Sequence, residues 1–162
     1  MDRYLPVFLR VEGRTCLVVG GGQVATRKAR ALLAAGAHVV VVAPSWTPTV
    51  ATLVERGAID LRPRPFTPED LEGVFLVVAA TDDPTVNETV ARAAHERRVL
   101  VNVVDAPERG SFLVPATFRR GDALVAIGTN GRSPALARWV RRRLEAWIDG
   151  VLQRDTTPQP EA

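Results

Sequence analysis

Three consecutive glycines at positions 20–22 follow an apolar run and precede a pattern typical of a helix. Glycine lets the backbone turn sharply and approach a phosphate, and the first N–H groups of a helix attract negative charge. Read as G-x-G-x-x-[GA], the motif positions are Gly20, Gly22 and Ala25. The arrangement predicts a loop that holds the pyrophosphate of a dinucleotide. The alternative interpretation is a glycine-rich turn without a ligand.

Further residues are expected to contact the same dinucleotide. Backbone groups of Gln23 and Val24 should meet the pyrophosphate and the adjoining ribose. An acidic residue usually follows the second strand and binds the adenosine ribose, but residues 43–45 read Ala-Pro-Ser and carry no charge. The residues therefore do not separate NAD from NADP. Residues at the second, fourth and fifth expected strands are also expected to contact the dinucleotide, although Asp82 is nearly as readily explained as a plain helix cap. They are Ala43, Pro44, Ser45, Ala80, Thr81, Asp82 and Asn102.

Asp105 is the candidate catalytic residue because it directly follows the apolar run 99–104. Ligands of doubly wound sheets bind at the carboxyl ends of the strands, so this side chain should lie at the cleft. A carboxylate there could accept the proton released when a hydride moves to a nicotinamide, or could contact a metal. The alternative is a turn-forming aspartate before Ala106-Pro107.

Arginine accounts for nearly all of the basic residues. The chain carries 21 Lys and Arg, of which Lys28 alone is lysine, and a formal charge of +3. Genome composition can produce such a bias, but the clustering also suits a polyanionic partner. Aromatic residues are not interleaved as single-stranded nucleic acid requires, so a carboxylate-rich small molecule is favoured over nucleic acid. The clustered arginines are Arg109, Arg119, Arg120, Arg132, Arg138, Arg141, Arg142 and Arg143.

Composition limits the class of protein. The 162 residues suffice for one domain with a proper core. No apolar run reaches the roughly 18 residues that span a bilayer, and the first residues resemble no signal peptide, so a cytoplasmic protein is expected. The single cysteine, Cys16, lies in an expected strand and allows no disulfide within the chain. His38 and His95 belong to different elements, and no metal site is expected.

Strand-like and helix-like segments alternate over the first 104 residues. Apolar strands expected to be buried on both faces alternate with helices, which predicts an α/β, Rossmann-type, doubly wound parallel sheet. Pro63 and Pro65 interrupt the third strand and place it near an edge. The expected strands are 15–19, 38–43, 59–64, 75–80 and 100–104, and the expected helices are 23–35, 49–56 and 84–97.

The pattern changes after residue 110. Two β-like runs, 111–120 and 123–128, flank Gly121-Asp122 and predict a hairpin. Ser133 and Pro134 then fit the start of a helix as N-cap and first residue. We expect a Rossmann domain over 1–112, a dimerisation region over 113–150 and a flexible tail over 151–162. The expected apolar stripe of the last helix, on which the Trp139 and Trp147 pair suggests interface packing, comprises Leu136, Val140, Leu144, Trp147 and Ile148.

Short motifs in a specific order cover nearly the whole chain. They are Leu5-Pro-Val-Phe, Val18-Val-Gly-Gly-Gly-Gln-Val-Ala, Arg27-Lys-Ala-Arg, Ala79-Ala-Thr-Asp-Asp, Asn102-Val-Val-Asp-Ala-Pro, Ser111-Phe-Leu-Val-Pro-Ala and Ser133-Pro-Ala-Leu-Ala-Arg. With these motifs the chain resembles the precorrin-2 dehydrogenase and sirohydrochlorin ferrochelatase family, the N-terminal module of siroheme synthases.

The resemblance implies NAD-dependent oxidation of precorrin-2 to sirohydrochlorin in siroheme biosynthesis, by homodimers, with Asp105 as the acid/base. Many members of the family also insert Fe²⁺, which stays open here because the family's helical C-terminal domain is largely absent from these residues. The substrate is a carboxylate-rich tetrapyrrole. Candidate residues for binding it are Arg109, Ser111, Arg132 and Ser133.

Two other functions compete with this enzyme. The first is a non-catalytic NAD-binding sensor, such as the regulatory domains of ion transporters. These domains normally carry the acidic residue after the second strand and lack the segment Asn102-Val-Val-Asp105 followed by a hairpin. The second is a scaffold that dimerises without catalysing a reaction.

Overall fold

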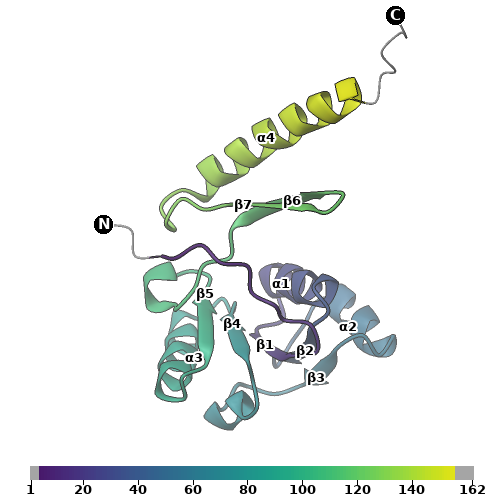
Figure 1. The fold of residues 1–162 in the computed structure, drawn as a ribbon. Coiled ribbons are helices and arrows are strands. Elements are labelled where there is room, and N and C mark those ends of the chain that lie inside the picture. Colours follow the sequence, from purple (N-terminus) through teal and green to yellow (C-terminus); the bar gives the residue numbers. More distant parts are fainter. Residues whose placement is uncertain (1–3, 156–162) are drawn as a thin grey trace, which may run out of the picture. The chain divides into compact units, whose positions relative to one another are not determined.

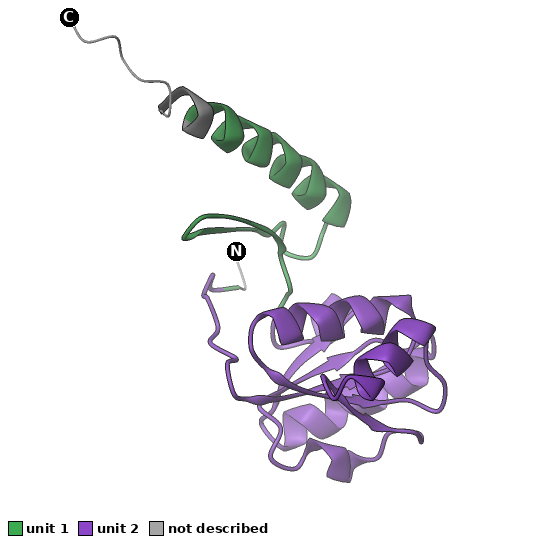
Figure 2. Cartoon of the chain, turned by 90° about the vertical axis from the view of Figure 1, so that its right-hand side faces the viewer, with its two compact units in different colours: residues 1–4, 113–162 green, residues 5–112 purple. Residues whose placement is uncertain are grey.

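The computed structural model describes the backbone of residues 4–155 and the side chains of residues 4–151. These residues form two compact units, coloured separately in Figure 2. We call Leu5–Phe112 the Rossmann unit. Tyr4 and residues 113–155 belong to the second, the hairpin–helix unit.

The Rossmann unit is built on five parallel strands in the order β3-β2-β1-β4-β5. Consecutive strands run outward from β1 to β3, and the chain then returns to the other side of β1 with β4. This reversal creates a switch point at the carboxyl ends of β1 and β4, where doubly wound sheets bind ligands. The predicted Rossmann-type fold is confirmed. The strands are β1 (Thr15–Val19), β2 (His38–Val42), β3 (Asp60–Arg62), β4 (Leu76–Ala79) and β5 (Leu100–Val103).

Helices cover both faces of this sheet, as Figure 1 shows. Helices α1 (Gln23–Ala34) and α2 (Pro48–Glu55) pack on one face, and α3 (Pro84–Glu96) packs on the other. Alternate residues of one strand therefore enter different cores: Val18 faces α1, and Leu17 faces α3. Burial on both faces explains why the strand sequences are continuously apolar. Two short 3₁₀ helices, η1 (Pro68–Leu71) and η2 (Pro107–Arg109), complete the unit.

Several details of the Rossmann unit bear on the predictions. The short strand β3 lies at the sheet edge, as expected. Cys16 is fully buried in β1, and burial raises the pKa of its thiol to about 11, which keeps it protonated and inert. Helix α1 buries Ala25, Thr26 and Ala29, whereas Val24 is exposed.

The hairpin–helix unit contains one antiparallel hairpin and one long helix. Strands β6 (Ala116–Arg120) and β7 (Ala123–Ile127) flank a turn at Gly121, whose φ of 53° suits glycine. Helix α4 (Pro134–Asp155) packs on β6, and the Ser133 hydroxyl accepts a hydrogen bond from the Leu136 N–H at 3.2 Å, as an N-cap should. The Arg120 guanidinium ties β6 to α4 through Asp149 (2.5 Å) and Glu145 (3.0 Å).

Two predicted boundaries around this unit differ from the structure. The first β-like run was expected from Ser111, but β6 begins at Ala116. Ser111 instead hydrogen-bonds with β5: its N–H donates to the Val101 carbonyl, and its hydroxyl accepts from the Val101 N–H, both at 2.8 Å. Helix α4 continues to Asp155, past residue 151, where the flexible tail was expected to begin. The rest of that tail, residues 156–162, lies outside the described residues.

Candidate functional site

A cavity of about 640 Å³ opens at the carboxyl ends of the strands of the Rossmann unit. Its walls come from the glycine loop after β1, the segment after β2, the turn after β3, the loop after β4 and the start of α3. This is the position that the switch point predicts for a bound nucleotide. The lining residues are Val19, Gly20, Gly21, Gly22, Val42, Pro44, Ser45, Trp46, Thr47, Pro65, Phe66, Ala80, Thr81, Asp82, Asp83, Thr85, Val86 and Thr89.

The three glycines of the loop have different physical roles. Gly20 has a φ of 122°, and a Cβ on it would overlap the Ala80 carbonyl. A Cβ on Gly21 would overlap the Ser45 carbonyl. A Cβ on Gly22 would meet no atom within 4 Å and would occupy free space that the loop presents. The first two glycines therefore allow the loop to pack against neighbouring strand ends, and the third leaves room for a phosphate to approach the backbone. The motif-based interpretation passed over Gly21, because its template skips that position.

Helix α1 begins at this loop without a side-chain cap. Gly22 is its N-cap residue, and no acidic residue lies in its first turn. The neighbouring helices α2 and α3 are capped by the side chains of Thr47 and Asp83. The Thr26 hydroxyl holds the loop in place, since it donates to the Gly22 carbonyl at 2.8 Å and lies 2.9 Å from the Thr47 hydroxyl. The first turn of α1 is thus free of an internal carboxylate and suited to an external anion.

The loop after β4 is fixed by Asn87, a buried residue of α3. Its Oδ1 accepts hydrogen bonds from the N–H of Thr81 at 3.1 Å and from its hydroxyl at 2.8 Å. Its Nδ2 donates to the Thr81 carbonyl and to Oδ1 of Asp105, both at 3.0 Å. Asn87 was not among the site residues predicted from the sequence. The available signal was an amide side chain on the otherwise apolar face that Val90, Ala91 and Ala94 bury.

Asp105 lies beside the large cavity and does not line it. Its exposed side chain contributes to a smaller cavity of about 230 Å³ together with Asn87, Glu88, Val103, Glu108 and Arg109. Asn87 hydrogen-bonds to both the Thr81 loop of the large cavity and Asp105. The described structure therefore connects the candidate catalytic carboxylate to the large cavity through one amide group.

The other predicted coenzyme-binding residues divide into two groups. Residues that line the large cavity are Gly20, Gly22, Pro44, Ser45, Ala80, Thr81 and Asp82. Outside that lining lie Gln23, Val24, the buried Ala43 and Asn102, whose Nδ2 donates to the Phe112 carbonyl at 3.1 Å.

The predicted substrate-binding residues are not gathered in one place. Arg109 lines the smaller cavity and forms an ion pair with Glu88 at 2.9 Å. Ser111 is held against β5 by its hydrogen bonds with Val101. Arg132 and Ser133 belong to the hairpin–helix unit, where Ser133 caps α4. Within the Rossmann unit, the structure therefore brings only Arg109 close to Asp105.

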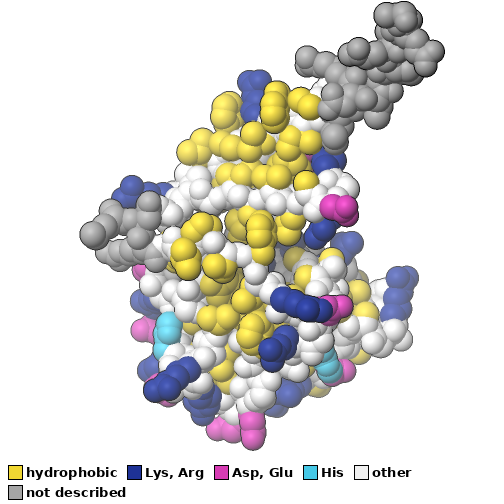
Figure 3. Space-filling view, in the orientation of Figure 1, with side chains coloured by type: hydrophobic (Ala, Val, Ile, Leu, Met, Phe, Trp, Pro, Cys, Tyr) yellow, Lys and Arg dark blue, Asp and Glu magenta, His cyan; other side chains and the backbone are white. Residues whose placement is uncertain are grey.

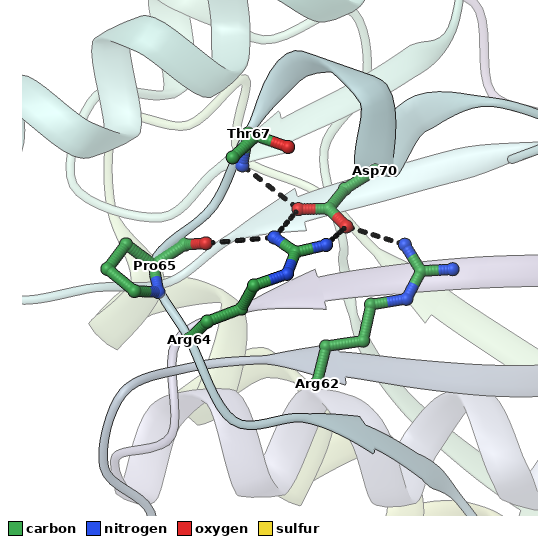
Figure 4. Close-up of polar contacts among 5 residues, drawn as sticks. All are labelled: Arg62, Arg64, Pro65, Thr67 and Asp70. Atoms are coloured by element: carbon green, nitrogen blue, oxygen red, sulfur yellow. Dashed lines mark hydrogen bonds and ion pairs between the residues drawn. The ribbon is translucent and has the colours of Figure 1, made fainter.

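A buried carboxylate supports the wall of the large cavity at Pro65 and Phe66. Figure 4 shows the hydrogen bonds around Asp70 of η1. Its carboxylate accepts hydrogen bonds from Arg62 at 2.6 Å, from Arg64 at 2.6 and 2.8 Å, and from the Thr67 N–H at 2.9 Å. Arg64 also donates to the Pro65 carbonyl at 3.0 Å. Burial would raise the pKa of Asp70, but hydrogen bonds from Arg64, the Thr67 N–H and Arg62 together hold this pKa below its usual range. Asp70 is thus an ionised anchor for the turn that follows β3.

The described residues contain neither a cluster of metal ligands nor a membrane-spanning helix. Among the described side chains, no group of three or more His, Cys, Asp and Glu residues is arranged to hold a metal ion. Within residues 4–155, no helix combines the length and the apolar character needed to cross a bilayer.

Sequence and structure comparisons place the chain among known proteins. The family described as putative NAD(P)-binding matches residues 7–116, and the central family of sirohaem biosynthesis proteins matches residues 125–146. Siroheme synthase 3 of Aeromonas hydrophila is 48% identical over 145 residues, which cover 90% of this chain and 31% of that protein. Siroheme synthase of Azotobacter vinelandii is 49% identical with the same coverage. The chain thus spans about a third of the length of these relatives.

The chain matches one solved structure over a larger share of that protein's length. "SirC, precorrin-2 dehydrogenase" superimposes with a TM-score of 0.77 at 34% sequence identity. The match covers 88% of this chain and 70% of SirC. The chain therefore belongs to the family that precorrin-2 dehydrogenase shares with the siroheme synthases, and its Rossmann unit is the NAD(P)-binding domain of that family.

Proposed function

We propose that this protein oxidises precorrin-2 to sirohydrochlorin with NAD as the hydride acceptor, as a step of siroheme biosynthesis. The similarity to SirC supports the reaction. The observation that carries the proposal is the coenzyme cavity at the glycine loop, whose Thr81 wall is tied through Asn87 to the Asp105 carboxylate. A coenzyme site joined to one acidic side chain provides the two functions that a dehydrogenase needs.

The cavity fits a dinucleotide coenzyme. Its volume lies within the roughly 300–1,000 Å³ usual for such sites. The pyrophosphate would lie over Gly22 and the first turn of α1, where the backbone leaves open space. Trp46, Phe66 and Val86 offer apolar surface to the adenine ring. When bound, the nicotinamide would accept a hydride from the substrate.

Charge favours NAD over NADP. The described lining residues include Asp82 and Asp83 but neither lysine nor arginine. The two arginines at the end of β3, Arg62 and Arg64, are held by the buried Asp70. A 2′-phosphate would therefore meet carboxylates in the cavity and no free cation from this turn, an electrostatically unfavourable site for it.

Asp105 would act as the base of this reaction. Oxidation removes one hydride and one proton from the substrate, and an ionised carboxylate at the rim of the coenzyme site can take the proton. Arg109, in the same small cavity, would bind a substrate carboxylate by exchanging it for Glu88. Ser111, Arg132 and Ser133 remain candidates for further contacts with the tetrapyrrole.

We also propose that the protein is a homodimer joined through the hairpin–helix unit. Figure 3 shows hydrophobic side chains gathered over β7 and α4. Large exposed apolar patches in a folded chain mark interaction sites. Those exposed on this unit include Leu124, Leu136, Trp139, Leu144 and Trp147, and the last of them is 64% exposed.

The test is turnover of precorrin-2 by the full chain with NAD. We expect NADH and sirohydrochlorin to appear in equal amounts, and Asp105→Asn to slow the reaction by about 100-fold or more while leaving NAD affinity unchanged. Asp60→Asn is the matched control, since Asp60 is an exposed aspartate of β3 paired with His38. NAD binding without turnover by the wild-type protein would refute the dehydrogenase and support a sensor or a scaffold.

A further inference from the structure

We propose that Asn87 is the positioning residue for the catalytic carboxylate, holding Asp105 in a fixed orientation relative to the coenzyme loop. This inference rests on the proposed function of Asp105. The side chain of Asn87 is 1% exposed, and all four of its hydrogen bonds go to only two residues, Thr81 and Asp105.

The orientation of the Asn87 amide is fixed by its partners. A backbone N–H can only donate, so the atom of Asn87 that meets the Thr81 N–H must be Oδ1. A carbonyl can only accept, so the atom that meets the Thr81 carbonyl must be Nδ2. The second hydrogen of Nδ2 then points at Oδ1 of Asp105, 3.0 Å away. A donor in this position holds one carboxylate oxygen of Asp105 in place and so fixes the direction in which the other oxygen points.

The Thr81 end of this connection is rigid. The Thr81 hydroxyl accepts a hydrogen bond from the Asp83 N–H at 3.2 Å, and Asp83 caps α3 by accepting from the Thr85 N–H at 2.8 Å. The backbone N–H of Asn87 itself donates to the Asp83 carbonyl at 3.1 Å. Thr81, Asp83 and Thr85 all line the coenzyme cavity. A coenzyme bound there and the Asp105 carboxylate are therefore positioned by the same hydrogen-bonded turn.

Other charged groups near Asp105 do not replace this donor. Glu88 comes from α3, and Glu108 and Arg109 come from η2, and all three line the small cavity with Asp105. Arg109, the cation among them, is paired with Glu88 at 2.9 Å. Among the described residues, Asn87 donates a hydrogen bond to the Asp105 side chain.

Asn87→Asp tests the proposal with little change in shape. The new carboxylate can still accept both hydrogen bonds from Thr81, but it faces the Thr81 carbonyl and Asp105 with an oxygen instead of a donor. Two carboxylates about 3 Å apart cannot both ionise easily, so the acid limb of the pH–rate profile should move to higher pH by about one unit or more. We expect kcat at neutral pH to fall by roughly 10-fold or more. NAD affinity should fall by a smaller factor, since Thr81 lines the coenzyme cavity but keeps its hydrogen bonds to the new carboxylate.

Asn87→Ser separates charge from position, because it removes the amide donor without adding a carboxylate. It should lower kcat with a smaller movement of the acid limb than Asn87→Asp causes. Arg92→Gln, at an exposed position of the same helix, is the control and should leave both quantities unchanged. If Asn87→Asp does not fold, Asn87→Ser carries the test.

A second measurement does not depend on turnover. In the coenzyme-free protein, carboxyl-carbon NMR should show the Asp105 resonance displaced in Asn87→Ser and Asn87→Asp relative to the wild type, because the carboxylate loses the donor that orients it. An active wild type together with variants of unchanged kcat, pH profile and Asp105 resonance would overturn the inference. An inactive wild type whose variants still show the NMR shifts would instead overturn the proposed function.

Discussion

The Rossmann unit and the hairpin–helix unit differ in where they place their apolar side chains. Strands β1, β2, β4 and β5 of the Rossmann unit are buried on both faces by the helices of the same unit. In the hairpin–helix unit, Leu136, Leu144 and Trp147 of α4 are exposed, and Phe118 and Ala137 are its buried apolar residues among those described. The Rossmann unit therefore holds a complete core and an intact ligand cavity, whereas the hairpin–helix unit presents an apolar surface that needs a partner.

We expect the greatest loss of stability from a substitution in the glycine loop of the Rossmann unit. Gly21→Ala would place a Cβ on the Ser45 carbonyl, so the loop must move away from the segment after β2. We expect the free energy of unfolding to fall by about 3 kcal/mol, measured by urea denaturation. Gly22→Ala is the matched control, since its Cβ meets open space, and it should unfold as the wild type does. Equal stability of Gly21→Ala and the control would contradict this account of the loop.

A smaller loss of stability should follow from Asp70→Asn. The substitution removes the charge that holds Arg62 and Arg64, but both arginines are half-exposed and can be solvated once released. The free energy of unfolding should therefore fall by roughly 2 kcal/mol at neutral pH. Coenzyme affinity should also weaken, because the turn that carries Pro65 and Phe66 loses its anchor.

The same aspartate predicts a pH dependence. The pKa of Asp70 is lower in the folded state than in the unfolded chain, so its stabilising effect is complete above the unfolded value of about 4 and is lost as the pH falls through the folded value. The stability difference between wild type and Asp70→Asn, followed by denaturation at decreasing pH, should shrink below about pH 4. A difference that stays constant down to the folded value would show that the charge of Asp70 does not stabilise the fold.

Arg120→Ala should have a weaker effect, confined to the hairpin–helix unit. It removes the ion pairs with Glu145 and Asp149 that tie β6 to α4. The guanidinium of Arg120 holds the pKa of Asp149 below its usual range, so this carboxyl should titrate at higher pH in the variant. Hydrogen exchange should speed up in β6 and α4 and stay unchanged in β1 and β4. Faster exchange in the central strands as well would show that the two units do not differ as we describe.

Trp147→Glu should have the smallest effect on the free energy of unfolding, because this side chain is 64% exposed. Sedimentation equilibrium should nevertheless show a shift toward the monomer, since a charge at an apolar interface must be desolvated. Arg142→Glu on the same helix is a charge-changing control at an exposed position, and comparison of the two separates lost apolar burial from altered charge. A wild-type monomer, or a dimer unchanged by Trp147→Glu, would remove the proposed interface.

The sequence predicted the Rossmann fold because its decisive signals are local. A continuously apolar run such as 15–19 indicates a strand buried on both faces, and three glycines before a helix indicate a tight turn. The face of α1 that packs on the sheet was harder to predict from the sequence, because Ala25 and Ala29, rather than the larger Val24, fit close to the sheet. The region 111–115 was misassigned because the hydrogen bonds of Ser111 with Val101 outweigh its β-like pattern.

The site was predicted in part for the same reason. The strand ends contribute Ala80 and Thr81 to the cavity, as topology requires. The separation of Asp105 from the cavity and its connection through Asn87 depend on side-chain hydrogen bonds between α3 and the segment after β5. Such contacts join residues 18 positions apart and leave no periodic signal in the chain.

Equilibrium titration of NAD into the wild type and Gly22→Ala tests the central claim most directly. A Cβ at Gly22 would meet no atom within 4 Å, so the variant should fold normally. Because the added methyl group would stand on the backbone that we propose holds the pyrophosphate, the variant should bind NAD roughly 10-fold or more weakly. A wild-type protein that does not bind NAD, or a Gly22→Ala variant with undiminished affinity, would show that the glycine loop does not hold the coenzyme.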